Sequence, residues 1–146
     1  SYKLTYSVSD KANNKATVTR TITVKKDTAK PTISGAFNKT VYIGSSFNTL
    51  TGVTAKDNVD GNITKKIKVS GSVNMKKAGS YKLTYSVSDK ANNKATVTRT
   101  ISTKKDTAKP KISGAFNKTV YISSSFNTLT GVTAKDNVDG NITKKI

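Results

Sequence analysis

Apolar and polar residues alternate strictly along residues 81–87, which read "YKLTYSV". The residues on the apolar face are Tyr81, Leu83, Tyr85 and Val87. Alternation with a period of two, in a run rich in aromatic and β-branched residues, is typical of an antiparallel strand with one buried face. The pattern therefore predicts such a strand, with Leu83 and Tyr85 directed into a core.

A second alternating run, "ATVTRTIST", covers residues 95–103 and places Val97 and Ile101 on the inward face. Weaker patterns predict three further strands, at residues 39–43, 52–56 and 63–71. The apolar positions show no helical period. Short strands separated by turn signals predict an all-β fold, an immunoglobulin-like antiparallel β-sandwich.

The sequence repeats with a period of 79 residues, and residues 1–67 align with residues 80–146 without a gap. Four aligned pairs differ: Thr23 and Ser102, Val24 and Thr103, Thr32 and Lys111, and Gly44 and Ser123. A period of this length predicts a tandem array of units in series. Units this similar have not diverged into separate recognition sites, which favours a structural role.

The boundary between units is predicted at residues 23–33, "TVKKDTAKPTI", where the alternation stops and Pro31 follows a run of charges. Proline has no N–H for a strand ladder, so Pro31 suits the start of an edge strand. Cutting before Asp27 predicts three parts. They are the last two strands of one unit (1–26), a complete unit (27–105) and the N-terminal part of a third (106–146).

The first residues already lie inside a strand pattern, so we interpret the chain as a window on a longer array. Its partners are then neighbouring repeats of the same chain. If the ends are true termini, head-to-tail copies of the chain are the alternative partners, because each end holds what the other lacks.

Three motifs span nearly the whole predicted unit: "VTAKDNVDGNIT" at 53–64, "GSYKLTYSVSD" at 79–89 and "NKATVTRT" at 93–100. Together they resemble the bacterial immunoglobulin-like repeats related to hyalin-repeat domains. That family often has Gly-Asn in the last hairpin loop, where this sequence has Asn92-Asn93. Asparagine also tolerates left-handed backbone angles, so the turn is expected to form.

The resemblance implies repeats carried in tandem on large surface proteins and adhesins, mostly of Gram-positive bacteria. It therefore implies a non-catalytic spacer or stalk in an adhesin or extracellular fibre, located outside the cell at the surface or in the cell wall. A match of this kind is specific for the fold and weak for the function.

The chain has a formal net charge of +18, supplied by 24 Lys and the two arginines Arg20 and Arg99. Such a charge attracts anionic polymers. Base readout depends on Arg and single-strand binding on clustered aromatics, so scattered lysines predict no specific nucleic-acid partner. Two interpretations stay open: a solvated surface that discourages edge pairing, or a module that holds an anionic glycan or cell-wall polymer.

Missing residue types exclude several kinds of site. The sequence contains no Cys and no His, which excludes a disulfide framework and a Cys/His zinc site. Its apolar runs are all far shorter than the roughly 18 residues of a membrane helix, so no membrane insertion is predicted.

All eight acidic residues are aspartates in predicted loops, four in each period. In an immunoglobulin-like sandwich, the loop after the second strand and the last hairpin loop lie at the same end. The residues of the complete unit expected to converge there are Asp27, Asp57, Asp60 and Asp89, with Asn93 beside them.

Several interpretations of this convergence remain open. Aspartates in turns often bond only their own backbone. Alternatively, Asp27, Asp57, Asp60, Asp89 and Asn93 are ligands of a Ca²⁺ ion at the junction between units, the one cofactor that the sequence suggests. Paired carboxylates for catalysis need a pocket that shifts one pKa, which loops without His, Cys or Glu do not provide, so no catalytic residue is predicted. An intramolecular Lys–Asn isopeptide bond would need a buried acid beside the Lys and the Asn. Every acid in this sequence lies in a predicted loop, which argues against such a bond.

Overall fold

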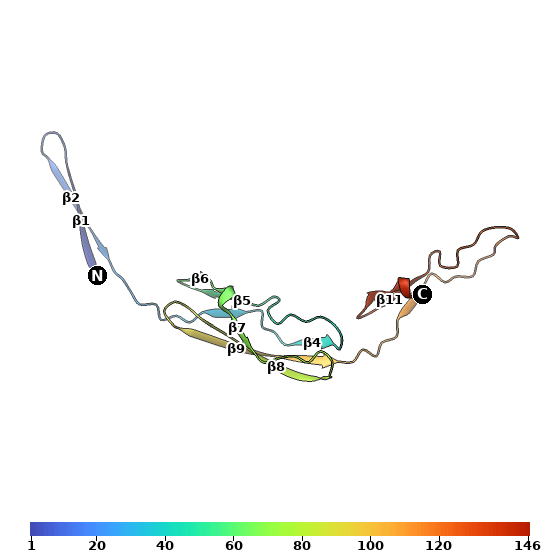
Figure 1. The fold of residues 1–146 in the computed structure, drawn as a ribbon. Helices are drawn as coiled ribbons and strands as arrows, with labels where there is room; N and C mark the ends of the chain where they lie inside the picture. Colours follow the sequence, from blue (N-terminus) through green and yellow to red (C-terminus); the bar gives the residue numbers. More distant parts are fainter.

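A computed structural model describes all 146 residues. The chain is elongated, and its parts follow one another in sequence order (Figure 1). A hairpin lies at the N-terminal end, a two-layered β structure lies in the middle, and a smaller β segment forms the C-terminal end. The structure is all-β, as the sequence predicts.

The central part is a sandwich of two sheets. The first sheet is antiparallel and has the order β3-β5-β6, with β3 at Thr32–Ser34, β5 at Thr54–Asp57 and β6 at Gly61–Asn62. The second has the order β4-β9-β8-β7, with β4 at Lys39–Tyr42, β9 at Lys94–Lys104, β8 at Gly79–Ser88 and β7 at Lys68–Ser70. Strand β4 runs parallel to β9, and the other pairs are antiparallel.

The core lies between these two sheets. Strands β8 and β9 contribute its most deeply buried large side chains, Leu83, Tyr85 and Ile101. Val87 of β8 and Val41 of β4 belong to the same sheet, and the opposite sheet and its connections complete the cluster with Val53, Ala55, Ile63 and Ile67. The alternation predicted for residues 81–87 is confirmed, because Leu83, Tyr85 and Val87 are buried and Tyr81 is half-buried, whereas the residues between them are more exposed.

One buried position of β9 carries a charge. Arg99 lies in the same alternating phase as Val97 and Ile101 and is almost fully buried. Its guanidinium donates a 2.8 Å hydrogen bond to the Thr49 carbonyl and stacks over the Tyr85 ring. The Tyr85 hydroxyl donates to the same carbonyl at 2.6 Å. A desolvated cation is stabilised here by an aromatic face and a backbone acceptor.

The sequence prediction for residues 63–71 is wrong in part. A 3-10 helix, η1 (Thr64–Lys66), occupies the start of this range, and only β7 forms a strand. The Thr64 side chain explains the turn, since its hydroxyl accepts a hydrogen bond from the Ala55 N–H at 3.0 Å and its N–H donates to Asn62 Oδ1.

The two ends of the chain repeat parts of the sandwich without their partners. The N-terminal hairpin consists of β1 (Tyr2–Ser9) and β2 (Lys15–Ile22). Its residues 2–22 are identical to residues 81–101, which form most of the β8–β9 hairpin. The C-terminal end contains β10 (Lys111–Ser113), β11 (Thr133–Asp136), β12 (Gly140–Asn141) and η2 (Thr143–Lys145). These elements match β3, β5, β6 and η1.

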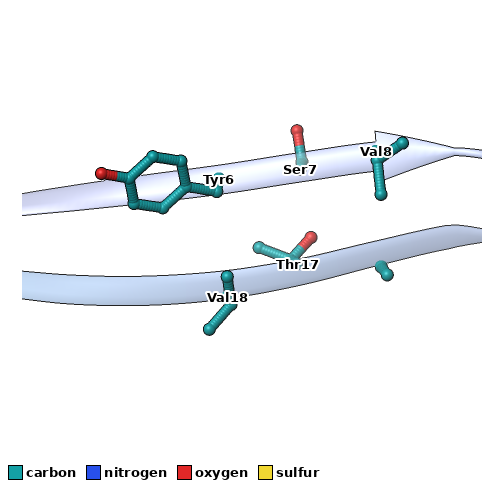
Figure 2. Close-up of a pocket in the computed structure, with 6 residues that line it drawn as sticks. Tyr6, Ser7, Val8, Thr17 and Val18 are labelled. Carbon is teal, nitrogen blue, oxygen red and sulfur yellow. The ribbon is translucent and has the colours of Figure 1, made fainter.

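The apolar faces of both ends are exposed. Tyr6, which corresponds to the fully buried Tyr85, is 49% exposed. Ile122, which follows the counterpart of β4, is 99% exposed. The hairpin carries an open apolar groove lined by Tyr6, Ser7, Val8, Ala16, Thr17 and Val18 (Figure 2). Part of this lining occupies the same positions as the core residues Tyr85 and Val87.

These identical sequences separate local from tertiary causes of structure. The three-stranded sheet and its 3-10 helix form in both copies, so their own residues are sufficient. Strand β4 forms only where β9 lies beside it, since residues 118–121 are not a strand. Pairing with β9 at the edge of the same sheet therefore specifies β4.

The repeat provides a matched test of the core. Leu83→Ala is expected to lower the free energy of unfolding by about 2–5 kcal/mol, because it leaves a cavity at a fully buried position. Leu4→Ala changes the identical residue of the hairpin, which is 44% exposed, and is expected to cost less than about 1 kcal/mol. Urea unfolding followed by circular dichroism measures both; equal costs would contradict this core assignment.

Candidate metal centre at the loop pole

Three loops meet at one end of the sandwich, which we call the loop pole: the linker around Asp27, the turn at residues 57–60, and the loop at residues 89–93. One carboxylate oxygen from each of Asp27, Asp57 and Asp89 lies within 4.8 Å of the other two. The three residues are separated by up to 62 positions in the sequence. The fold therefore brings together three negative charges that no local motif places side by side.

Local hydrogen bonds hold each carboxylate in place. Asp27 Oδ1 accepts from the Ala29 N–H at 3.0 Å. Asp89 follows the last residue of β8 and is 5% exposed. Its Oδ1 accepts from the Asn93 N–H, and its Oδ2 accepts from the Asn93 side-chain amide, both at 2.7 Å. The loop between β8 and β9 is closed by these bonds, with Asn92 in the left-handed conformation at φ 69°.

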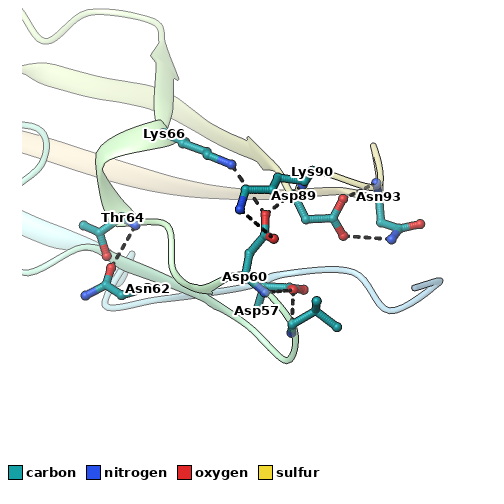
Figure 3. Close-up of polar contacts among 9 residues, drawn as sticks. Asp57, Asp60, Asn62, Thr64, Lys66, Asp89, Lys90 and Asn93 are labelled. Atoms are coloured by element: carbon teal, nitrogen blue, oxygen red, sulfur yellow. Dashed lines mark hydrogen bonds and ion pairs between the residues drawn. The ribbon is translucent and has the colours of Figure 1, made fainter. Parts of the chain in front are cut away.

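Asp57 is the last residue of β5, and its two carboxylate oxygens differ. Oδ1 accepts from the N–H groups of Val59 and Asp60, at 2.9 and 3.0 Å (Figure 3). These two bonds hold the pKa of Asp57 below its ordinary value, because they stabilise the charged form. Oδ2 is buried and has no hydrogen-bond partner. A buried carboxylate oxygen without a partner is costly, and Oδ2 can still accept a bond from a donor or a cation.

Asp60 does not join this group. Its carboxylate forms ion pairs with Lys66 at 3.5 Å and Lys90 at 3.9 Å, and it accepts a hydrogen bond from the Lys90 N–H at 2.8 Å (Figure 3). The side chain is 7% exposed. Asp60 thus fastens the turn after β5 to the loop after β8, and lysines neutralise its charge.

Asn93 contacts two of the three aspartates as a donor. Its side-chain amide nitrogen donates to Asp89 Oδ2 and, at 3.3 Å, to the backbone carbonyl of Asp27. The linker is therefore attached to the loop pole by a side chain from the last hairpin. Of the five predicted ligands, the structure brings together the carboxylates of Asp27, Asp57 and Asp89, and gives Asp60 and Asn93 other contacts.

No ion pair in the structure involves Asp27, Asp57 or Asp89; the three that form are those of Asp60 and one between Lys145 and Asp139. The three carboxylates offer oxygen donors alone, which suits a hard cation such as Ca²⁺. Like charges this close repel each other unless a cation lies between them.

No sequence pattern marks Lys66 and Lys90 as partners of Asp60. Lysines are common throughout the chain, so their presence carried no signal. The buried Arg99 was detectable, since it follows Val97 by two residues in an alternating run.

The chain matches the family described as "Bacterial surface protein, Ig-like domain" over residues 1–24 and again over residues 31–103. The matched residues make up more than half of the sequence and include both sheets of the sandwich. The chain therefore belongs to this family of bacterial immunoglobulin-like domains, as the motifs of the sequence indicate.

Among solved structures, the chain is similar to two from Clostridium perfringens ZmpB. One contains the CBM51-2 domain in complex with GlcNAc together with INT domains, at 32% identity, 53% coverage of this chain, 17% of that one and a TM-score of 0.49. The other contains the M60 catalytic domain with CBM51-1 and CBM51-2. It is 30% identical over 66% of this chain and 10% of that one, with a TM-score of 0.48.

The lipoprotein BT2262 from Bacteroides thetaiotaomicron is similar at 26% identity, with coverage of 54% of this chain and 40% of that one, and a TM-score of 0.43. The chain thus spans less than half the length of each of these three proteins. No curated protein shows a significant match. The structure contains no helix long and apolar enough to cross a membrane.

Proposed function

We propose that this chain is part of a non-catalytic spacer, a stalk of immunoglobulin-like units in a bacterial surface adhesin or extracellular fibre. The observation that carries the proposal is the path of the chain through the sandwich. The chain enters at the loop pole, beside Asp27, and leaves after β9 at the opposite end (Figure 1). Units joined in this way extend in one direction, so each adds length.

The near identity of the two copies supports the same proposal. Residues 1–67 and 80–146 differ at four positions, and none of the four is an aspartate or a buried core residue of β8. A linker without glycine joins the hairpin to the sandwich, at residues 23–31. Glycine-free linkers sample fewer backbone conformations, so successive units keep their direction better than on a flexible tether.

Arrays of one, two and three complete 79-residue periods test the spacer. Because units are joined end to end, the maximum dimension from small-angle X-ray scattering is expected to rise by a constant increment with each added period. A radius of gyration that grows only as the cube root of the number of periods would indicate side-by-side packing and contradict the proposal.

The lysine-rich surface favours a second candidate, a module that holds an anionic glycan or cell-wall polymer. Of 26 cationic side chains, only Lys66, Lys90 and Lys145 form ion pairs with carboxylates. The unpaired charges are available to a polyanion. A continuous contact with phosphate or sulfate groups would release counterions and depend strongly on salt.

Titration with heparin and with teichoic acid separates the two candidates. A spacer with a solvated surface is expected to bind weakly, without saturation, and only below physiological salt. Saturable binding that persists at about 0.15 M salt would favour the binding module instead. A chain of the same fold with half of its exposed lysines changed to Gln serves as the charge control.

In an array, the partners of a unit are the neighbouring units. The two ends of this chain correspond to the C-terminal and the N-terminal parts of one unit. Within the sandwich, β8 and β9 donate three hydrogen bonds to the loops on either side of β4. The Tyr85 hydroxyl and the Arg99 guanidinium donate to the Thr49 carbonyl, and the Thr100 N–H donates to the Asn38 side chain. Every one of these residues has an identical counterpart at the ends. The donors are Tyr6, Arg20 and Thr21, and the acceptors are Thr128 and Asn117.

In an array the neighbouring repeats of the same chain supply what each end lacks. For the 146-residue chain with free ends, we infer that copies associate head to tail, with the hairpin of one copy completing residues 106–146 of the next. The composite unit lacks the counterpart of residues 68–79, which includes the edge strand β7. It is open along that edge, so the association is expected to be weaker than folding of the covalent unit.

Sedimentation velocity of the 146-residue chain measures this association. The sedimentation coefficient is expected to rise with concentration, because apolar faces at both ends become buried. Leu4→Asp should abolish the rise by placing a charge on the hairpin face, whereas Thr5→Asp, on the opposite face, should preserve it. A concentration-independent monomer would refute head-to-tail completion.

A further inference from the structure

We infer that the loop pole binds one Ca²⁺ ion through the carboxylates of Asp27, Asp57 and Asp89. The first reason is the donor set: three carboxylate oxygens, each from a different segment, lie within 4.8 Å of one another. Ca²⁺ is bound by oxygen ligands at about 2.3–2.6 Å, so two ligands of one ion are at most about 4.6–5.2 Å apart. The three oxygens lie within this limit and can therefore share one ion.

The second reason is the buried Oδ2 of Asp57, which has no partner. The other oxygen of this carboxylate is already used by the Val59 and Asp60 N–H groups. Turn formation therefore explains Oδ1 and leaves Oδ2 unexplained. A buried anionic oxygen of this kind is stabilised by a proton, a donor or a cation, and no donor in the structure reaches it.

Charge compensation within the loop pole is the third reason. Lys66 and Lys90 pair with Asp60, and no lysine forms an ion pair with any of the three aspartates. The protein as a whole is strongly positive, yet no lysine pairs with this partly buried cluster, whose formal charge is −3. A divalent cation cancels two of these three negative charges, whereas a single lysine beside the cluster would cancel only one.

Ca²⁺ fits this cluster better than Mg²⁺. Ca²⁺ accepts six to eight oxygens in irregular geometry, while Mg²⁺ requires a near-ideal octahedron and gives up its waters reluctantly. The three carboxylates come from a linker, a strand end and a hairpin loop, which is an irregular arrangement. Water molecules complete the coordination of an ion held by three side chains.

The ion would also fix the linker. Between the end of β2 at Ile22 and the start of β3 at Thr32, the residues without regular structure are 23–31. The Asn93 amide already holds the Asp27 backbone at 3.3 Å, and ligation of the Asp27 carboxylate would add a second, stronger attachment of the middle of this segment to the sandwich, with residues 23–26 remaining between it and β2. A stronger attachment narrows the range of angles between the hairpin and the sandwich. This consequence rests on the proposed spacer function, whereas binding itself does not.

Isothermal titration of the 146-residue chain with CaCl₂ tests the site. We expect one Ca²⁺ per chain with a Kd of about 0.1–1 mM, the range of extracellular calcium modules. Asp27→Asn keeps an acceptor for the Ala29 N–H but removes a charge and a ligand, so affinity is expected to fall at least about tenfold. Asp57→Asn is a second variant with the same expectation.

The repeat supplies a matched control. All titrations use chains with Leu4→Asp, which stay monomeric, because in a head-to-tail pair Asp10 of the other copy would supply the counterpart of Asp89 beside Asp106. In that background Asp106→Asn changes the same residue in the same sequence, "KKDTAKP", without a counterpart of Asp89 beside it, and its affinity is expected to equal that of the Leu4→Asp chain. Melting curves in chelator check that all variants fold equally. Absence of binding at about 10 mM Ca²⁺, which is well above that range, would overturn the site. So would unchanged affinity in Asp27→Asn, and equal affinity for Mg²⁺ would overturn the choice of ion.

A second measurement tests the effect on the linker separately. The chain has no cysteine, so Thr17→Cys in the hairpin and Lys82→Cys in β8 provide a unique pair of spin-label positions. The distance distribution between the labels is expected to narrow in Ca²⁺ and broaden in chelator. A distribution that Ca²⁺ leaves unchanged, in a chain that binds the ion, would refute the stiffening and leave the site intact.

Discussion

The packing of the β8–β9 hairpin against the β3-β5-β6 sheet is the interaction on which the rest of the structure depends. It buries Leu83, Tyr85 and Ile101 completely and places Arg99 where Thr49 accepts its charge-assisted hydrogen bond. The two ends of the chain show what is lost without it. The isolated hairpin keeps its register but exposes its apolar face. At the C-terminal end the three-stranded sheet forms, but the counterpart of β4 does not, because it has no β9 to pair with.

This division explains how much of the fold the sequence predicts. The hairpin strands and the three-stranded sheet form from local alternation and turn residues, and the alternation at residues 81–87 predicted the buried face correctly. The parallel pairing of β4 with β9 depends on contacts between residues about 62 positions apart, so no local period encodes it. The 3-10 helix was missed because its cause is a side-chain bond from Thr64 to a strand nine residues earlier.

The candidate site follows the same rule. The sequence predicts that the site is made of aspartates and at which end of the sandwich it lies, because these aspartates are in loops that follow strands whose ends meet there. Which aspartates face each other was not, since Asp60 lies only three residues from Asp57 yet turns toward Lys66 and Lys90. Its counterpart Asp139 repeats the local turn but is 61% exposed, against 7% for Asp60, so burial of this side chain requires the second sheet.

The distribution of acids then has a physical explanation in a chain of this charge. Aspartates inside strands would meet lysines at many positions and compete with the intended register. Confined to the loop pole, one aspartate per unit pairs with lysines and three remain together. Since all three lie within a single period, every complete unit of an array carries its own set. The site therefore repeats with the units, and its occupancy would act on each linker independently of the next.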